Sequence, residues 1–350
     1  MLISGKDYLG VSLTEEAFKA VLFRAQGPGG KITQVLKTDI KDVPEADLPK
    51  VIQTSLSGMN VRRPVQAFCI IPANQAITKN IEIPSLDAEE IRSIIDLQAG
   101  RHTPYSREEI LVGYITIGVF QRNYTKVLLI IVNRDIIKKQ LTFFEAAGVK
   151  IEKTVFVPEG SARFYARALN IKPDDAPVGI IDIAQQATCF TVEFNSTVAT
   201  CRSIPVGLSH IRQEGPPAAA RLLEEVIKSV ELYQTEDINK LPDRYIVACA
   251  HALTKDFQTP LQENVKVPVN VMHYTEIAPV DAAVKSKLES DYADDSFSDI
   301  AACGLTVQET AVDLTPDEIK VQRSLEEKSR ELIRAGVAGI VLLILVCGIF

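Results

Sequence analysis

Residues 178–207 read VGIIDIAQQATCFTVEFNSTVATCRSIPVG, a succession of β-prone runs with a turn near Asn195-Ser196. β-Branched and aromatic residues favour strands, while Asn and Ser favour the turn between them. A helical stretch follows at 218–233, then the strand run RYIVACA at 244–250 and a strand region at 265–272. Strands that alternate with helices in this way predict an α/β lobe.

The chain before this lobe shows the same alternation. Residues 9–23 (LGVSLTEEAFKAVLF) and 31–37 (KITQVLK) are β-prone runs, and the QGPGG between them is a hairpin signal rather than a Walker A phosphate loop, whose spacing it lacks. An amphipathic helix is expected at 46–56 and a buried strand at 65–71. The rigid polar run PDDAP at 173–177 marks the point where the second lobe begins.

A third group of elements lies between these two lobes. The run PSLDAEEIRSIIDLQAG predicts a helix over 84–100 with Asp87 or Ser85 near its N-cap. Strand runs follow in ILVGYITIG and KVLLIIV, and a helix at 135–147 is stopped by Gly148. The order helix, strand, strand, helix predicts a small α+β subdomain.

Composition sets limits on the function. A chain of 350 residues with 46% hydrophobic content is long enough for two core-bearing lobes. The net charge of −7 and a pI near 5.3 give no general basic footprint, so nucleic acid is not expected as a partner. The six cysteines lie far apart in apolar runs without CxxC pairs, which predicts reduced thiols in a cytoplasmic compartment. The start of the chain does not resemble a cleaved signal peptide.

The C-terminal run is of a different kind. Residues 335–350 read AGVAGIVLLILVCGIF, without charge or proline, and predict a transmembrane segment. The run is about four residues short of the roughly 20 that a helix needs to cross a bilayer, so we expect the span to be cut by the end of this sequence. Basic residues crowd its N-terminal side, and such a flank favours the cytoplasmic face. They are Lys320, Arg323, Lys328, Arg330 and Arg334.

Three further runs carry a resemblance to a known family. They are KNIEIPSLDAEEIRSIIDLQAGRHTPYSREEI (79–110), VNRDIIKKQLTFFEAAGVKIEKTVFVPEGSARFYARAL (132–169) and CRSIPVGLSHI (201–211). With the order of segments over about residues 9–309, they resemble the type IV pilus assembly protein PilM. The likeness extends more distantly to the cytoplasmic part of GspL of type II secretion and to the division protein FtsA.

This resemblance implies an actin-like, ribonuclease H-like fold with two lobes around a nucleotide cleft. The first lobe would comprise residues 1–75 and 153–175, with the inserted subdomain at 76–152 between them. The second lobe would comprise 176–309. A juxtamembrane linker at 310–334 and the membrane segment at 335–350 would complete the chain.

The family pattern also places a nucleotide site. Actin-like proteins hold ATP with two phosphate hairpins and a glycine-rich adenosine loop, where backbone must approach the ligand closely. Aligned through Lys19, the acid and the glycine of the first hairpin fall at Ser12 and Thr14. The second hairpin keeps its acid as Asp182 and a hydroxyl as Thr188.

The glycines of that pattern are largely replaced. Ala184 stands in the second hairpin, Ala248 and Ala250 stand in the adenosine loop, and the paired glycines of the next turn read Gly207-Leu208. A Cβ at a close-approach position meets the ligand, so we expect a vacant or weak site without resident ATP or magnesium, and Asp182 as a structural acid. The alternative is an ATP-binding switch or slow ATPase, for which the retained Lys19, Asp182 and Thr188 speak.

No other catalytic constellation stands out. The four histidines form no HExxH motif, and no GxSxG elbow offers a serine nucleophile. His251, next to the adenosine-loop position, is interpreted as structural. The acidic run Asp291, Asp294, Asp295 and Asp299 is predicted to be an exposed loop without the ligand spacing for calcium.

The linker contains a second resemblance. Val312, Asp313, Leu314 and Pro316 belong to the run VDLTP, which resembles the short peptide by which the membrane partner PilN docks onto PilM. A plain linker, with Thr315 as N-cap and Pro316 opening a helix, fits nearly as well. The expected function is a non-catalytic scaffold at the cell inner membrane with its bulk in the cytoplasm. Its expected partners are PilN- and PilO-like platform proteins and a cytoplasmic motor ATPase, with a homodimer as a further option.

Overall fold

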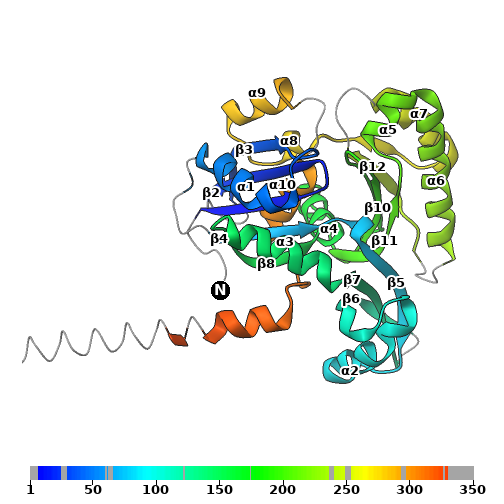
Figure 1. Cartoon of the computed structure of the whole chain (residues 1–350). Helices are drawn as coiled ribbons and strands as arrows, with labels where there is room; N and C mark the ends of the chain where they lie inside the picture. Colours follow the sequence, from blue (N-terminus) through cyan, green and yellow to red (C-terminus); the bar gives the residue numbers. More distant parts are fainter. Residues whose placement is uncertain are drawn as a thin grey trace, which may run out of the picture. The chain divides into compact units, whose positions relative to one another are not determined.

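The computed structural model describes residues 7–24, 30–59, 61, 66–120, 123–173, 175–235, 240–248, 254–292, 297–325 and 328–329. The described residues up to Leu314 form one compact unit, and those from Thr315 onward fall into a second. Figure 1 shows the sheets and helices of the first unit, coloured along the sequence.

The first lobe is built on a five-stranded sheet in the order β3-β2-β1-β4-β8. β1 and β2 form a hairpin, β3 continues it antiparallel, and β4 and β8 add parallel strands. Aromatic rings fill the core, with Tyr8 stacked on Phe23 at 5.0 Å between ring centroids. The strands are β1 (Tyr8–Leu13), β2 (Ala17–Arg24), β3 (Lys31–Asp39), β4 (Gln66–Ile71) and β8 (Lys150–Phe156).

The second lobe repeats this topology in the order β11-β10-β9-β12-β13. An antiparallel meander again leads into parallel strands, so the two lobes are two copies of one sheet plan. The predicted turn at Asn195 and Ser196 is confirmed, and both residues adopt positive φ. The strands are β9 (Val178–Ile183), β10 (Thr188–Phe194), β11 (Thr197–Ile204), β12 (Arg244–Ala248) and β13 (Val269–Val271).

Helices cover these sheets. α4 contacts β8 of the first sheet and β10 and β11 of the second, while α10 packs on β1, β2 and β4. The two helices contact each other and so link the lobes. The helices are α1 (Leu48–Ser57), α3 (Arg134–Ala146), α4 (Val157–Ala168), α5 (Leu208–Glu214), α6 (Pro216–Gln234), α7 (Thr254–Val265), α8 (Tyr274–Ile277), α9 (Ala282–Ser290) and α10 (Ser298–Thr306).

The inserted subdomain has a sheet of its own, in the order β5-β7-β6. α2 (Ala88–Gln98) packs its Ile91 and Ile95 against this sheet. Asp87 caps the helix by accepting from the backbone N–H groups of Glu89 and Glu90, which confirms the predicted N-cap. The strands are β5 (Ala76–Ile83), β6 (Ile110–Phe120) and β7 (Tyr124–Asn133).

Two helices make contacts beyond the expected lobe boundaries. α3, expected in the insertion, contacts β7 of the inserted sheet and also α1 and β8 of the first lobe, with Phe144 against Phe18. α10, expected in the second lobe, lies on the first sheet. Both differences arise because an apolar helix face shows that a helix is buried without showing against which sheet.

The linker also begins later than expected. Residues 310–314 belong to the compact unit, whereas the described residues from Thr315 onward do not. A helix follows at 317–325, one residue later than expected, and the Pro316 carbonyl accepts from the N–H of Lys320. The expected transmembrane segment at 335–350 lies outside the described residues. No helix in the described part of the chain has both the length and the apolar character that a membrane crossing requires.

Candidate functional site

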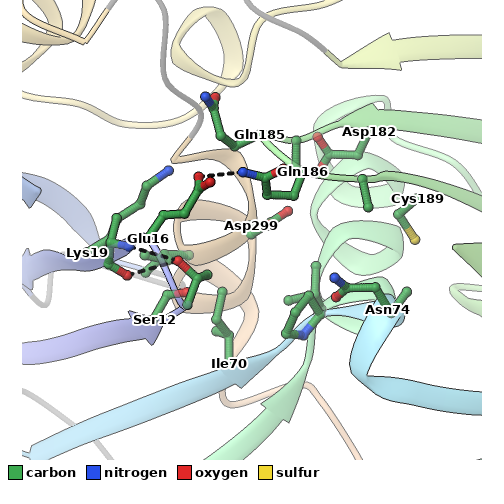
Figure 2. A pocket seen from close by; sticks show the side chains of 18 of the residues that line it. Ser12, Glu16, Lys19, Ile70, Asn74, Asp182, Gln185, Gln186, Cys189 and Asp299 are labelled. Carbon is green, nitrogen blue, oxygen red and sulfur yellow. Dashed lines mark hydrogen bonds between the residues drawn. The ribbon is translucent and has the colours of Figure 1, made fainter. Parts of the chain in front are cut away.

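A cavity of about 150 Å³ lies between the β1–β2 hairpin and the β9–β10 hairpin. The predicted site residues of both hairpins line it: Ser12, Thr14, Lys19, Asp182, Ala184 and Thr188. The residues aligned with the two hairpins therefore meet at one cavity, although they belong to opposite lobes. Figure 2 shows this cavity from close by.

Two predicted residues that the structure describes do not line the cavity. Gly207 lies behind the second hairpin, and Ala248 is buried at the end of β12, in register with Asp182. Ala250 and the neighbouring His251 lie outside the described residues. Of the two predicted adenosine-loop alanines, the structure therefore describes only the first, Ala248.

The turn of the first hairpin uses its own hydrogen-bonding groups. The Thr14 hydroxyl accepts from the Ala17 N–H at 3.0 Å and donates to the Ala17 carbonyl at 3.1 Å. The Thr14 N–H also donates to the Ala17 carbonyl at 3.0 Å. Thr14, at the expected glycine position, thus closes the turn upon itself and withdraws the amides of Thr14 and Ala17 from a ligand.

The second hairpin is bound from behind by the start of α5. The N–H groups of Leu208 and Ser209 donate to the carbonyls of Ala184 and Gln185, each at 3.0 Å. A Cβ on Gly207 would lie 2.6 Å from the Ala184 carbonyl oxygen, so this glycine serves the contact between α5 and the hairpin. The amides of Leu208 and Ser209, near a helix N-terminus where anions usually bind, are therefore already used.

The hydroxyl of Thr188 is also engaged. It is fully buried and donates to the Val206 carbonyl at 2.7 Å. The predicted hydroxyl ligand of the second hairpin thus stabilises the segment that follows β11 instead of pointing a donor into the cavity.

The two hairpins meet directly in a contact that we call the hairpin bridge. It consists of Glu16 on the first turn and Gln186 on the second, whose side-chain amide donates to the Glu16 carboxylate. The Ser209 hydroxyl positions Gln186 by donating to its amide oxygen at 3.1 Å. Figure 2 shows the bridge spanning the gap between the hairpins. Its carboxylate brings negative charge to the place where an actin-like protein would bind phosphates.

Asp182 is held by its neighbours rather than presented to a metal ion. The Ser298 hydroxyl lies 3.0 and 3.2 Å from its two carboxylate oxygens, and the carboxyl of Asp299 is hydrogen-bonded to it. Burial, followed by the charge of Asp299, raises the pKa of Asp182 well above its usual range. The raised pKa favours the protonated carboxyl, which donates to Asp299 and is a poorer magnesium ligand than a carboxylate.

Asp299 was wrongly predicted to be part of an exposed acidic loop. It lies in the first turn of α10, lines the cavity and is partly buried. Burial raises its pKa, and the nearby charge of Lys19 opposes that rise. The Lys19 ammonium group lies 5.1 Å from the centre of the Phe297 ring, so the anchor lysine is directed toward the start of α10.

We expect Asp182→Asn to stabilise the protein at neutral pH. Because the folded-state pKa of Asp182 is raised, its favourable contribution is complete below the unfolded pKa of about 4 and is lost as pH rises toward the folded value. Asparagine can donate to Asp299 without this loss, so the gain in the free energy of unfolding should be nearly zero at pH 4 and should grow as the pH rises toward 7.

Denaturant unfolding of the full-length chain between pH 4 and 8 measures this gain. The exposed Asp42→Asn is the control and should show no such growth. A destabilised Asp182→Asn at pH 7 would mean that the charged carboxylate is the form that the fold requires.

The residues of the predicted docking peptide are placed on the body of the chain itself. Val312 and Leu314 are 3% and 2% exposed. The Val312 N–H donates to Glu159 at 3.1 Å, and the Leu314 N–H donates to the Thr154 carbonyl at 3.0 Å. Pro316 falls in the second unit.

Comparison with known proteins shows the family of this chain. The family model of the type IV pilus assembly protein PilM matches residues 31–214, more than half of the chain. The chain belongs to the PilM family. This confirms the resemblance drawn from the three sequence runs. No curated protein matches the chain in sequence.

Solved structures show the fold of this PilM-family chain. A PilM–PilN type IV pilus biogenesis complex superposes with a TM-score of 0.70 at 15% identity, covering 87% of this chain and 99% of that one. The cytoplasmic domain of EpsL, an inner-membrane component of the type II secretion system of Vibrio cholerae, superposes with a TM-score of 0.50 at 9% identity. It covers 89% of this chain and 99% of that one. The actin-like fold is therefore shown.

Sequence reasoning missed the residues that fill the space between the hairpins. Glu16 and Gln186 are ordinary polar turn residues, and Asp299 lies in an acidic run, so none carried a signal of its own. The signal available was position, because each lies next to an aligned hairpin or opens the helix that returns to the first sheet.

No group of three His, Cys, Asp or Glu side chains that could hold a metal ion occurs within the described ranges.

Proposed function

We propose that this PilM-family chain is a non-catalytic scaffold of a type IV pilus or type II secretion-like assembly platform. Its body would lie on the cytoplasmic side of the inner membrane, tethered through residues 335–350. It would hold platform components in position without turning over nucleotide.

The hairpin bridge is the observation that carries this proposal. A single exposed hydrogen bond contributes only about 0.5–1.5 kcal/mol, so its importance lies in where it sits. Glu16 and Gln186 join the two turns that would have to grip a triphosphate, and the Glu16 carboxylate repels such an anion.

The alternative is an ATP-binding switch or slow ATPase of the same machine. It is favoured by the meeting of Lys19, Asp182 and Thr188 at one cavity. It requires the bridge to open, the Asp182 carboxyl to leave Ser298 and Asp299, and the Thr188 hydroxyl to leave Val206. These three requirements together make the scaffold the better-supported function.

The partner would be an inner-membrane platform protein of the PilN kind. Support comes from the PilM–PilN complex, whose PilM shares the fold of this chain. The apolar run at 335–350 and its basic flank support a tether that keeps the body next to such a platform.

A chain that stops after Leu325 tests the tether. We expect the melting temperature of the body to be unchanged, because residues 310–314 remain. The shortened chain should no longer be found in the membrane fraction, and pilus or secretion assembly should be lost. Fractionation and an assembly assay in cells measure both effects. Appending an unrelated apolar transmembrane helix should restore assembly. A truncated chain that stays on the membrane and supports assembly would contradict the tether.

A further inference from the structure

Residues 310–314 lie along the free edge of the first sheet. β8 is the last strand of that sheet, and an unpaired edge strand readily accepts an added segment. The Leu314 N–H donates to the Thr154 carbonyl of β8 at 3.0 Å, and the Thr154 N–H donates to Asp313 Oδ1 at 3.1 Å. The segment is thus held in the manner of a peptide that adds to a sheet edge.

Glu159 of α4 holds the backbone of the same segment. Its side chain is fully buried, and its two carboxylate oxygens accept from the N–H groups of Ala311 at 2.7 Å and Val312 at 3.1 Å. Arg163 lies 3.2 Å from the same carboxylate and supplies the opposite charge. A buried, paired carboxylate that binds two successive amides recognises extended backbone whatever the side chains.

Lys153 fixes the beginning of the segment. Its ammonium group donates to the carbonyl of Thr310 at 2.5 Å and to the Thr310 hydroxyl at 2.8 Å. It also donates to the Val307 carbonyl at 3.2 Å, at the end of α10. The entry point of the segment is therefore set by a residue of β8.

The inserted subdomain supplies the opposite wall. A Cβ built on Gly113 of β6 would lie 2.9 Å from Val312 Cγ1 and 3.2 Å from Leu314 Cδ2. The absence of a side chain at Gly113 makes room for both apolar side chains. β6 and β8, with α4, thus form a groove that fits an extended peptide of the pattern apolar, acidic, apolar.

We propose that this groove is a peptide-docking site that the chain fills with its own residues 310–314, so that it is closed to a peptide of the same pattern from a partner. The ligand is covalently attached, and its effective concentration is in the millimolar range, well above that of a partner peptide. This inference goes beyond the scaffold role and does not depend on it. It implies that partner proteins bind this chain elsewhere until the segment is displaced.

The test uses the full-length chain and a labelled peptide of residues 310–315, acetyl-TAVDLT-amide. The segment is released by Val312→Asp with Leu314→Asp, or by Ala311→Pro, which removes one amide bound by Glu159 without adding charge. Hydrogen exchange at residues 311–314 verifies the release, and melting temperature verifies that each body is folded. Fluorescence polarisation then measures peptide binding.

We expect the released chains to bind the peptide at least 100-fold more tightly than the intact chain. Adding Gly113→Val to a released chain should abolish binding, whereas Gly118→Ala on the same strand should not, because the nearest atom to its Cβ is 3.6 Å away. The proposal is overturned if a folded, released chain fails to bind the peptide, if the intact chain binds it equally well, or if Gly113→Val has no effect. None of these outcomes involves nucleotide or membrane, so they are separate from the tests of the scaffold role.

Discussion

Gly160→Val is expected to lower the stability of the protein by about 3 kcal/mol. Gly160 lies in α4 where this helix contacts α10, and a Cβ there would lie 2.6 Å from Cys303 Sγ and 2.9 Å from Cys303 Cα. The second of these atoms is backbone and cannot rotate away. Because α4 packs on the second sheet and α10 on the first, a larger side chain must push apart the two helices that link the lobes.

Thermal unfolding of the full-length chain measures the effect as a fall in melting temperature on the order of 5–10 °C. Gly118→Ala is the matched control, since its added Cβ meets no atom closer than 3.6 Å and should change the melting temperature little. Equal melting temperatures for Gly160→Val and the unmodified chain would show that the two helices do not pack as closely as described.

Glu159→Ala is expected to lower the stability of the protein by a similar amount, about 3 kcal/mol. The substitution removes the acceptor of the Ala311 and Val312 amides and leaves Arg163 without its partner. Buried donors that lose their acceptor cost about 1–3 kcal/mol each, and breaking a buried ion pair adds to this cost. The same change should expose residues 310–314 to rapid hydrogen exchange.

Glu145→Ala, an exposed position on α3, is the control and should leave both stability and exchange unchanged. Fast exchange at Ala311 and Val312 already in the unmodified chain would contradict the role given to Glu159. A large loss of stability without faster exchange there would place the effect in the Arg163 contact alone.

The fold was predictable because its signals are local. The alternation of β-prone runs with amphipathic helices gave both lobes, and the turn at Asn195-Ser196 and the cap at Asp87 fell where the residue types require them. The sheet against which α3 and α10 pack was not predictable in this way, because each helix carries an apolar face that could pack on either lobe. Only the packing of Phe144 on Phe18 and of α10 on β1 decides between them.

The candidate site was predictable at its aligned positions and not at the contacts that fill it. Lys19 and Asp182 anchored the two hairpins, so their neighbours Thr14, Ala184 and Thr188 could be placed. Glu16 and Gln186 meet across two lobes, which no local pattern reports. The burial of Val312 and Leu314 was not predictable, because both lie in a charged stretch. A run of five residues is too short to show that two apolar side chains are buried.

We expect this actin-like body to hold no nucleotide, and direct titration of the full-length chain with labelled ATP and magnesium tests this expectation. Up to millimolar ATP, we expect no saturable binding and an unchanged melting temperature, because a ligand at one hundred times its dissociation constant would add about 2.7 kcal/mol. Saturable binding in the micromolar range that is lost in Asp182→Ala would contradict the claim and establish the cavity between the hairpins as a working nucleotide site.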